Sequence, residues 1–140
     1  MRISEIMSRD VRTARPQDTI QDVAQAMREV DTGAVPVCDG ERLMGIVTDR
    51  DIVVRAVSEG RSFATPVTEV MSSNIEACYE DDDIRAAADK MAELQIRRLP
   101  VLDRDQRLVG IVSLGDIAQQ GKDKTTGQAL EEISEAPPNN

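Results

Sequence analysis

The sequence contains no histidine and no tryptophan, and only one phenylalanine and one tyrosine. Without histidine the chain lacks the usual general base and the commonest metal ligand, so hydrolytic and zinc chemistry are poor candidates. So few aromatic side chains offer no platform on which single-stranded bases could stack. The formal net charge of −9 disfavours binding to a phosphate backbone. We therefore expect no nucleic-acid partner.

Long apolar runs are absent as well. No stretch approaches the ~18 residues that mark a membrane-spanning helix, and the opening MRISEIMSRD lacks the apolar core of a signal peptide. We expect a cytoplasmic protein without a membrane segment. Cys38 and Cys78 are the only cysteines, and both lie in apolar stretches, which favours buried reduced thiols over a disulfide or a redox pair.

What the sequence does have is an internal repeat. A shift of 64 residues places Met7-Ser8 on Met71-Ser72 and Pro36-Val37 on Pro100-Val101. One additional residue in DRDQR then changes the shift to 65, so that GIVTDRDI (45–52) falls on GIVSLGDI (110–117). The insertion lies where a hairpin loop is expected, and loops tolerate insertions. We predict a tandem duplication with copies at 1–60 and 69–121, a linker at 61–68, and an acidic flexible tail at 122–140 in which GQALEEIS is a candidate short helix.

Each copy reads as strand, helix, strand, hairpin, strand and helix. In the first copy VRTA is a short strand, and Asp18 or Thr19 can cap the helix that follows. AVPVC and RLMGIVT are strands joined at Asp39-Gly40, a favoured hairpin dipeptide, and RDIVVRAV is a second helix. In the second copy the strands are RLPVL and RLVGIVS. The helical spacing predicts a buried face made by Ile20, Val23, Ala24, Met27 and Val30 in the first copy and by Ile84, Ala87, Ala88, Met91 and Leu94 in the second.

A copy of about fifty residues cannot bury both faces of a three-stranded sheet by itself. We therefore expect an α/β (α+β) fold of two pseudo-twofold-related units, each a small three-stranded sheet with two helices, packed sheet to sheet. The second helix carries Ile52, Val53 and Val57, which two copies alone leave uncovered. A homodimer is expected for this reason.

Two such copies, with the motifs TGAVPV, TDRDIV and IRRLPV, resemble a tandem pair of CBS domains, or Bateman module, of the small stand-alone bacterial type. The resemblance covers residues 1–121. It implies a regulatory module that binds an adenosine-containing ligand such as AMP, ADP, ATP, NAD or S-adenosylmethionine and signals to a partner protein. Enzymatic activity is not expected, because no nucleophile–base pair can be assembled without histidine.

The resemblance also implies two nucleotide clefts, each combining the Thr/Ser-x-x-Asp of one copy with strands of the other. The first cleft is expected to contain Thr48, Asp51, Asn74, Ile75, Glu76, Ile96, Arg97 and Arg98. The second is expected to contain Ser113, Asp116, Val11, Arg12, Thr13, Thr32, Gly33 and Ala34.

The chemistry of the Thr-x-x-Asp pair has two readings. An ionised aspartate can accept both hydroxyls of a ribose diol. Alternatively, Thr48 or Asp49 caps the second helix and Asp51 complements the helix dipole. Both copies keep the hydroxyl residue and the aspartate while the residues between them differ, and capping is expected to require only one of the two. We therefore favour ligand binding.

Charge distinguishes the two clefts. Arg97 and Arg98 suit a phosphate, because a guanidinium donates two parallel hydrogen bonds; a salt-bridged surface edge is the alternative. Gly33 and the residue after it offer room but no charge, although Arg12 could compensate, and Glu76 would repel a phosphate. The run EDDD at 80–83 is expected to cap a helix, and no metal site is predicted. A ligand-free interaction scaffold remains the alternative function.

Overall fold

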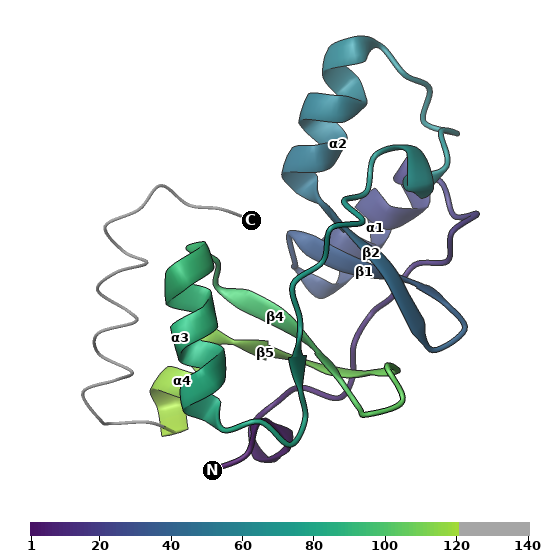
Figure 1. Cartoon of the computed structure of the whole chain (residues 1–140). Helices are drawn as coiled ribbons and strands as arrows, with labels where there is room; N and C mark the ends of the chain where they lie inside the picture. The colour runs from purple at the N-terminus through teal and green to yellow at the C-terminus, as the bar shows by residue number, and fades with distance from the viewer. Residues whose placement is uncertain (121–140) are drawn as a thin grey trace. The chain divides into compact units, whose positions relative to one another are not determined.

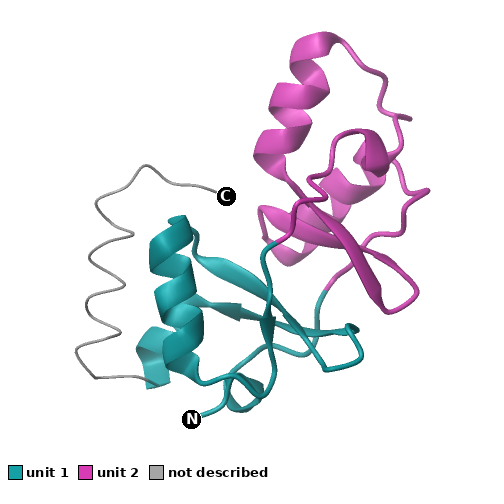
Figure 2. Cartoon of the chain, viewed as in Figure 1, with its two compact units in different colours: residues 1–11, 76–139 teal, residues 12–75, 140 magenta. Residues whose placement is uncertain are grey.

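The computed structural model describes residues 1–120 (Figure 1). The chain forms two compact units, and each is described by itself (Figure 2). Unit 2 consists of residues 12–75, and unit 1 combines residues 1–11 with the chain from residue 76 onward. The predicted tail at 122–140, with its candidate helix, lies outside the described residues. Within residues 1–120 no helix has the length and apolarity that crossing a membrane requires.

Unit 2 contains a helix, a two-stranded hairpin and a second helix. Its elements are α1 (Ile20–Val30), β1 (Ala34–Asp39), β2 (Arg42–Thr48), α2 (Asp49–Arg55) and the 3-10 helices η2 (Val57–Glu59) and η3 (Val67–Glu69). Thr19 caps α1 in a reciprocal box with Asp22, as its short polar side chain allows. The hairpin turns at Gly40, whose φ of +63° is readily adopted by glycine. The predicted helix start and hairpin are therefore confirmed.

Unit 1 repeats this order and adds a third strand. Its elements are the 3-10 helix η1 (Ile3–Glu5), β3 (Cys78–Tyr79), α3 (Ile84–Leu94), β4 (Arg98–Leu102), β5 (Leu108–Ser113) and α4 (Leu114–Gln120). The sheet has the order β3-β4-β5, with β3 parallel to β4 and β5 antiparallel to it. The chain therefore has the predicted mixed architecture of small sheets and helices.

The first copy does not form the third strand that its sequence predicts. Ala14 alone occupies that position, donating to the carbonyl of Pro36 at 2.9 Å and accepting from the N–H of Cys38 at 2.8 Å. The chain turns immediately afterwards, because the side chain of Asp18 accepts the N–H of Arg15 at 2.8 Å. Proline at position 16 has no N–H to continue a ladder. The strand is consequently reduced to a single bridge.

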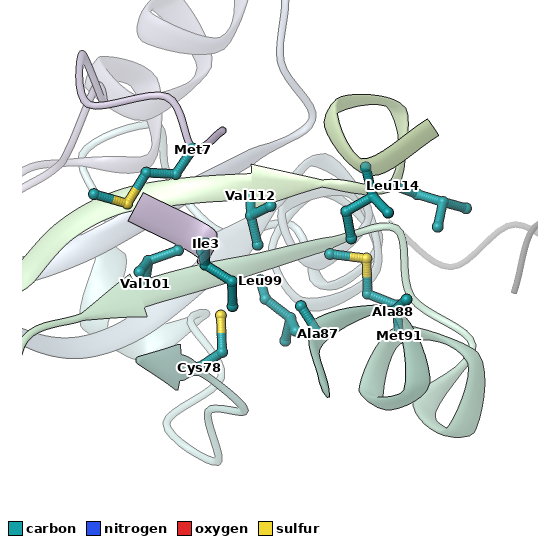
Figure 3. Close-up of a cluster of buried hydrophobic side chains, with 11 residues drawn as sticks. Ile3, Met7, Cys78, Ala87, Ala88, Met91, Leu99, Val101, Val112 and Leu114 are labelled. Atoms are coloured by element: carbon teal, nitrogen blue, oxygen red, sulfur yellow. The ribbon is translucent and has the colours of Figure 1, made fainter. Parts of the chain in front are cut away.

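Each unit has its own hydrophobic core, and the helices supply much of it. In unit 1 the predicted α3 positions Ala87, Ala88 and Met91 are buried beside β4 and β5 (Figure 3). In unit 2 the prediction for α1 is partly wrong, since Ala24 and Val30 are exposed. The buried side chains of α1 are those of Ile20, Val23, Ala26 and Met27. The buried face of this helix is therefore turned toward Ala26 relative to the predicted one.

Both cysteines lie in these cores. Cys38 and Cys78 are buried and free, in agreement with the prediction of reduced thiols. Burial raises the pKa of both thiols, and the carboxylate of Asp82 adds to the effect at Cys78, whose pKa reaches about 12 although Lys90 opposes the shift. Thiols held so firmly in the protonated form are poor nucleophiles.

The chain at the beginning of each copy packs into the core formed by the other copy. Ile3 and Met7 lie in the core of unit 1, beside strands of the second copy (Figure 3). Val67 at the end of the linker and Val70 at the start of the second copy are fully buried in unit 2. The compact units therefore do not coincide with the sequence repeats.

A single antiparallel β-bridge holds each of these segments in place. Ser72 exchanges hydrogen bonds of 2.9 and 2.8 Å with Ile46, and Ser8 exchanges two of 2.9 Å with Ile111. In both units the backbone of the segment lies close to the strand, because a glycine of the strand faces the segment. A β-carbon on Gly45 would lie 2.8 Å from the carbonyl oxygen of Ser72, so any larger residue would displace the segment.

Candidate functional site

The first candidate site lies where β1 begins and β2 ends in unit 2. Ala34 pairs with Thr48 in the antiparallel register, and the N–H of Asp49 donates to the carbonyl of Gly33 at 3.0 Å. These contacts bring residues 32–34 beside residues 48–51, and we name the two segments together the Thr48 edge. Thr48 is buried, which holds the edge firmly on the unit.

Unit 1 contains the equivalent site at the start of β4 and the end of β5. Arg98 pairs with Ser113, and the N–H of Leu114 donates to the carbonyl of Arg97 at 2.8 Å. Residues 96–98 and 113–116 together form the Ser113 edge. The two edges are thus built by the same contacts at repeat-related positions.

On both edges the hydroxyl residue and the aspartate form a reciprocal capping box. Oγ1 of Thr48 accepts the N–H of Asp51 at 3.1 Å, and Oδ2 of Asp51 accepts the N–H of Thr48 at 2.9 Å. Ser113 and Asp116 do the same at 3.0 and 2.9 Å. The expectation that capping requires only one residue of the pair is therefore wrong. Persistence of the pair in both copies is explained by helix capping without any ligand.

The second oxygen of each aspartate distinguishes the edges. Oδ1 of Asp51 lies 3.8 Å from Nε of Arg55, whose guanidinium also donates to the carbonyls of residues 70–71 at 3.3 and 3.4 Å. The second copy has Gln120 at the position of Arg55. Within residues 1–120 no donor contacts Oδ1 of Asp116. That oxygen is available to a hydroxyl group, whereas Asp51 shares its charge with a guanidinium.

The residues facing the aspartates differ in charge. Arg97 and Arg98 are exposed on the Ser113 edge. The equivalent positions of the Thr48 edge carry glycine and alanine, and a β-carbon at Gly33 would lie 3.1 Å from Oδ2 of Asp49. The Asp49 carboxylate therefore lies over the backbone of Gly33. One edge presents guanidinium groups where the other presents a carboxylate.

Two further predicted site residues are engaged in ion pairs. Glu76 lies 3.4 Å from Nζ of Lys90, which also donates to the carbonyl of residue 77 at 2.6 Å. The ammonium group offsets the repulsion that Glu76 alone would exert on a phosphate. Arg12 donates to Glu29 at 2.8 Å, so a carboxylate already occupies its guanidinium.

Each predicted cleft draws residues from both units. The structure brings together residues of the same copy, namely 32–34 with 48–51 and 96–98 with 113–116. The clefts that combine residues of opposite copies remain predictions. Of their other members, Asn74, Ile75, Arg12 and Thr13 belong to unit 2, and Glu76 and Val11 belong to unit 1.

Sequence reasoning missed two charged residues that contact predicted site residues, namely Arg55 beside Asp51 and Lys90 beside Glu76. Both are charged groups in exposed or half-buried helical positions, and such residues are usually solvated. Asp49 was considered as a helix cap but not as a neighbour of Gly33. The spacing of Asp51 and Arg55, four residues apart on a helix, is the one signal that indicated their pairing.

The acidic run at 80–83 is divided among separate partners. Asp83 caps α3 by accepting the N–H two residues further on at 2.9 Å, as predicted. Asp82 accepts the N–H of Tyr79 at 2.9 Å. Asp81 pairs with Arg104 at 2.9 Å, which holds the pKa of that carboxyl group below its usual value. The run therefore organises the start of α3 and its neighbouring loop.

A duplicated α/β unit, with a hydroxyl–aspartate pair at the end of the last strand in each copy, defines a two-repeat module. The CBS domain family model matches residues 3–58 and 67–122. The chain therefore belongs to the CBS domain family, as the resemblance of its motifs indicated.

Individual relatives agree with this assignment. The chain is 41% identical over 133 residues to the CBS domain-containing protein YhcV of Bacillus subtilis, covering 94% of each chain. It is similar to the solved CBS-domain-containing protein ATU1752 of Agrobacterium tumefaciens, with 28% identity and a TM-score of 0.74 over 86% of this chain and 98% of that one. It is also similar to the CBS domain pair of protein MJ0100 in complex with 5'-methylthioadenosine and S-adenosyl-L-methionine, with 28% identity and a TM-score of 0.74 over 86% and 94%.

Proposed function

We propose that this protein is a regulatory sensor of an adenosine-containing ligand, of the AMP, ADP, ATP or NAD type. The observation that carries the proposal is Asp116, whose Oδ1 is left without a donor inside residues 1–120 while Oδ2 is held by the helix cap. A carboxylate anchored by one oxygen can accept a ribose hydroxyl with the other. Arg97 and Arg98, which are predicted to lie in the first cleft with Thr48 and Asp51, would serve any phosphate group.

The MJ0100 complex supports this ligand class. Its two ligands, 5'-methylthioadenosine and S-adenosyl-L-methionine, share the adenosine group. The ribose diol is the part of that group that an aspartate would recognise. Within the class, a nucleotide with phosphate is favoured here by the arginines of the Ser113 edge.

The signal would reach a partner protein through a shift between conformations, since a ligand changes such an equilibrium by its differential affinity. The module acts as a homodimer in the cytoplasm in this proposal, regulating its partner rather than catalysing a reaction. Val53, Val54 and Val57 support a dimer, because they are 57%, 49% and 63% exposed along α2 and the turn that follows. Apolar side chains grouped in this way are typical of a surface that another chain covers.

Calorimetric titration and thermal shift with AMP, ATP and NAD test the proposal. A ligand that binds the folded chain raises the melting temperature by mass action. Asp116→Asn should weaken binding while an amide oxygen still serves the helix cap. The exposed Asp89→Ala on α3 is the control for loss of one charge, and it should leave binding unchanged. If no adenine nucleotide binds at millimolar concentration, the proposal fails.

The capping boxes favour a second candidate function. Because helix capping alone accounts for both hydroxyl–aspartate pairs, the chain is also consistent with a ligand-free scaffold that dimerises and binds a protein partner. In that case partner capture from solution would be insensitive to every adenine nucleotide. A partner whose binding changes with added AMP or ATP would exclude the scaffold.

A further inference from the structure

A methionine comes directly before the serine of the β-bridge in both copies. Met71 belongs to the segment that completes the core of unit 2, and Met7 belongs to the equivalent segment of unit 1. We infer that Met71 is a reversible oxidation site, and that its sulfoxide loosens the attachment of residues 67–72 to unit 2. This switch acts on the fold itself and needs no bound nucleotide.

The sulfur of Met71 lies against the backbone of β2. A β-carbon on Gly45 would lie 2.6 Å from Sδ of Met71 and 2.8 Å from the carbonyl oxygen of Ser72, so the sulfur fills the space that glycine leaves. The same side chain packs against the hydrophobic core of unit 2, to which Val67 and Val70 belong. An oxygen atom added to this sulfur has no room on the side that faces the strand.

Polar contacts on either side of the Met71 side chain fix the backbone of this segment. Ser72 exchanges hydrogen bonds of 2.9 and 2.8 Å with Ile46 of β2. The guanidinium of Arg55 donates to the carbonyls of Val70 and Met71 at 3.3 and 3.4 Å. Displacing the Met71 side chain from β2 would therefore disturb hydrogen bonds made by its own residue and by both of its neighbours.

A peroxide supplies the oxidant that this step requires. The sulfur attacks one peroxide oxygen, the O–O bond breaks as the S–O bond forms, and the other oxygen leaves as water after taking up the proton. The thioether is oxidised by two electrons and the peroxide is reduced. The product is a polar sulfoxide in place of an apolar sulfur, and burial of a polar group without a hydrogen-bond partner is unfavourable. The side chain should leave the strand and carry the segment with it.

Exposure distinguishes Met71 from the other methionines of the two cores. Met71 is half-buried, so a small oxidant can reach it. The others are 9%, 8% and 0% exposed, namely Met7, Met27 and Met91. Met44 is also half-buried and lies on β2 of the same unit, but within residues 1–120 it is not one of the side chains of the unit 2 core. It is therefore the matched control.

Hydrogen peroxide on the full chain, followed by peptide mass spectrometry, should add one oxygen to Met71 before Met7, Met27 or Met91 gains any. Native-state hydrogen exchange then reports the consequence along the chain. Protection of the Ile46 amide should fall about tenfold or more, as expected for one unpartnered polar group in a protein interior. Amides of β4 and β5 should keep their protection. Methionine sulfoxide reductases should restore protection in unit 2, because the sulfoxide is reducible.

Two variants assign the effect to one sulfur. Met71→Leu keeps the volume of the side chain but cannot take up oxygen, so its β1 and β2 should stay protected after peroxide treatment. Met44→Leu should lose protection as the wild type does. Circular dichroism establishes that each variant is folded, and reversal by the reductases tests the wild type without any substitution.

Oxidised Met71 with unchanged protection of the Ile46 amide would overturn the inference, as would oxidation of Met7 or Met27 ahead of Met71. Loss of protection in peroxide-treated Met71→Leu would also overturn it, because another side chain would then be responsible. Retained protection in peroxide-treated Met44→Leu would assign the effect to Met44 and would overturn it equally.

Discussion

Ile3 lies at the start of the first sequence repeat, yet its side chain is fully buried in the core of unit 1, which the second repeat builds. Replacing Ile3 with alanine should therefore destabilise the second repeat rather than the first. The backbone of this residue also donates to the carbonyl of Asp82 at 3.0 Å, so the segment is held at its place by more than one contact.

The size of the effect follows from the burial. Ile3→Ala removes three carbon groups at about 0.8 kcal/mol each, or roughly 2.4 kcal/mol of transfer free energy. The cavity left behind adds to this loss, so the free energy of unfolding should fall by roughly 2.5 to 5 kcal/mol. This is a large share of the ~5–15 kcal/mol that stabilises an ordinary domain.

Native-state hydrogen exchange followed by NMR is the appropriate assay, because it resolves stability along the chain. Amides of β4 and β5 in unit 1 should lose protection in Ile3→Ala, while those of β1 and β2 in unit 2 keep theirs. Val70→Ala is the reciprocal variant and should affect β1 and β2. Val30→Ala, at a position that is 46% exposed, should change stability by less than ~0.5 kcal/mol.

If Ile3→Ala lowers the exchange protection of β1 and β2, the conclusion that the start of the first repeat belongs to the core of unit 1 would be refuted. A destabilisation no larger than that of Val30→Ala would refute the burial argument itself.

Two other predictions concern the glycines and the buried thiol. Gly45→Ala and Gly110→Ala should each cost about 1–3 kcal/mol in urea unfolding, because the new β-carbon would lie 2.6–2.8 Å from a methionine sulfur and a serine carbonyl oxygen; Gly115→Ala, with its nearest neighbour at 3.6 Å, should cost nothing, and similar losses in all three would contradict the argument. Cys78 has a pKa raised from 9.0 to about 12, so the folded state keeps the proton more firmly than the unfolded one. Its contribution to stability is present below pH 9 and is lost as the pH rises toward 12, so wild type should lose more stability than Cys78→Ala between pH 9 and 10.5. Fast alkylation of Cys78 in the native protein at pH 8 would show that the thiol is not held in this way.

Local sequence signals anticipated much of each unit. The period of apolar residues located α1 and α3, Thr19 marked where α1 begins, and Asp39-Gly40 marked the hairpin. Such signals act between residues a few positions apart, so they can be recognised in the sequence alone. The exposed Ala24 and the buried Ala26 show their limit, because which face of the helix is buried depends on what covers it.

The candidate site was predicted in part. The hydroxyl–aspartate pairs were identified, but their reciprocal capping geometry was not, and it removes one reason for regarding the pair as a ligand site. The assignment of Asp49 to a position over Gly33 was also beyond sequence reasoning, because these residues lie sixteen positions apart and meet only through the β1–β2 register.

By itself the sequence determined the duplication, the order of elements, the mixed α/β class and the membership of the CBS domain family, because each of these is written in short patterns that recur in both copies. Tertiary structure decided which chain segment completes which core and which charges face each aspartate. Ile3 is buried in unit 1 and Val70 in unit 2, because burial of apolar surface is favourable however far apart in sequence the contacting residues are. Gly110 and Gly45 leave room for the backbone to approach at these places. Local sequence patterns do not reveal which of these long-range contacts form.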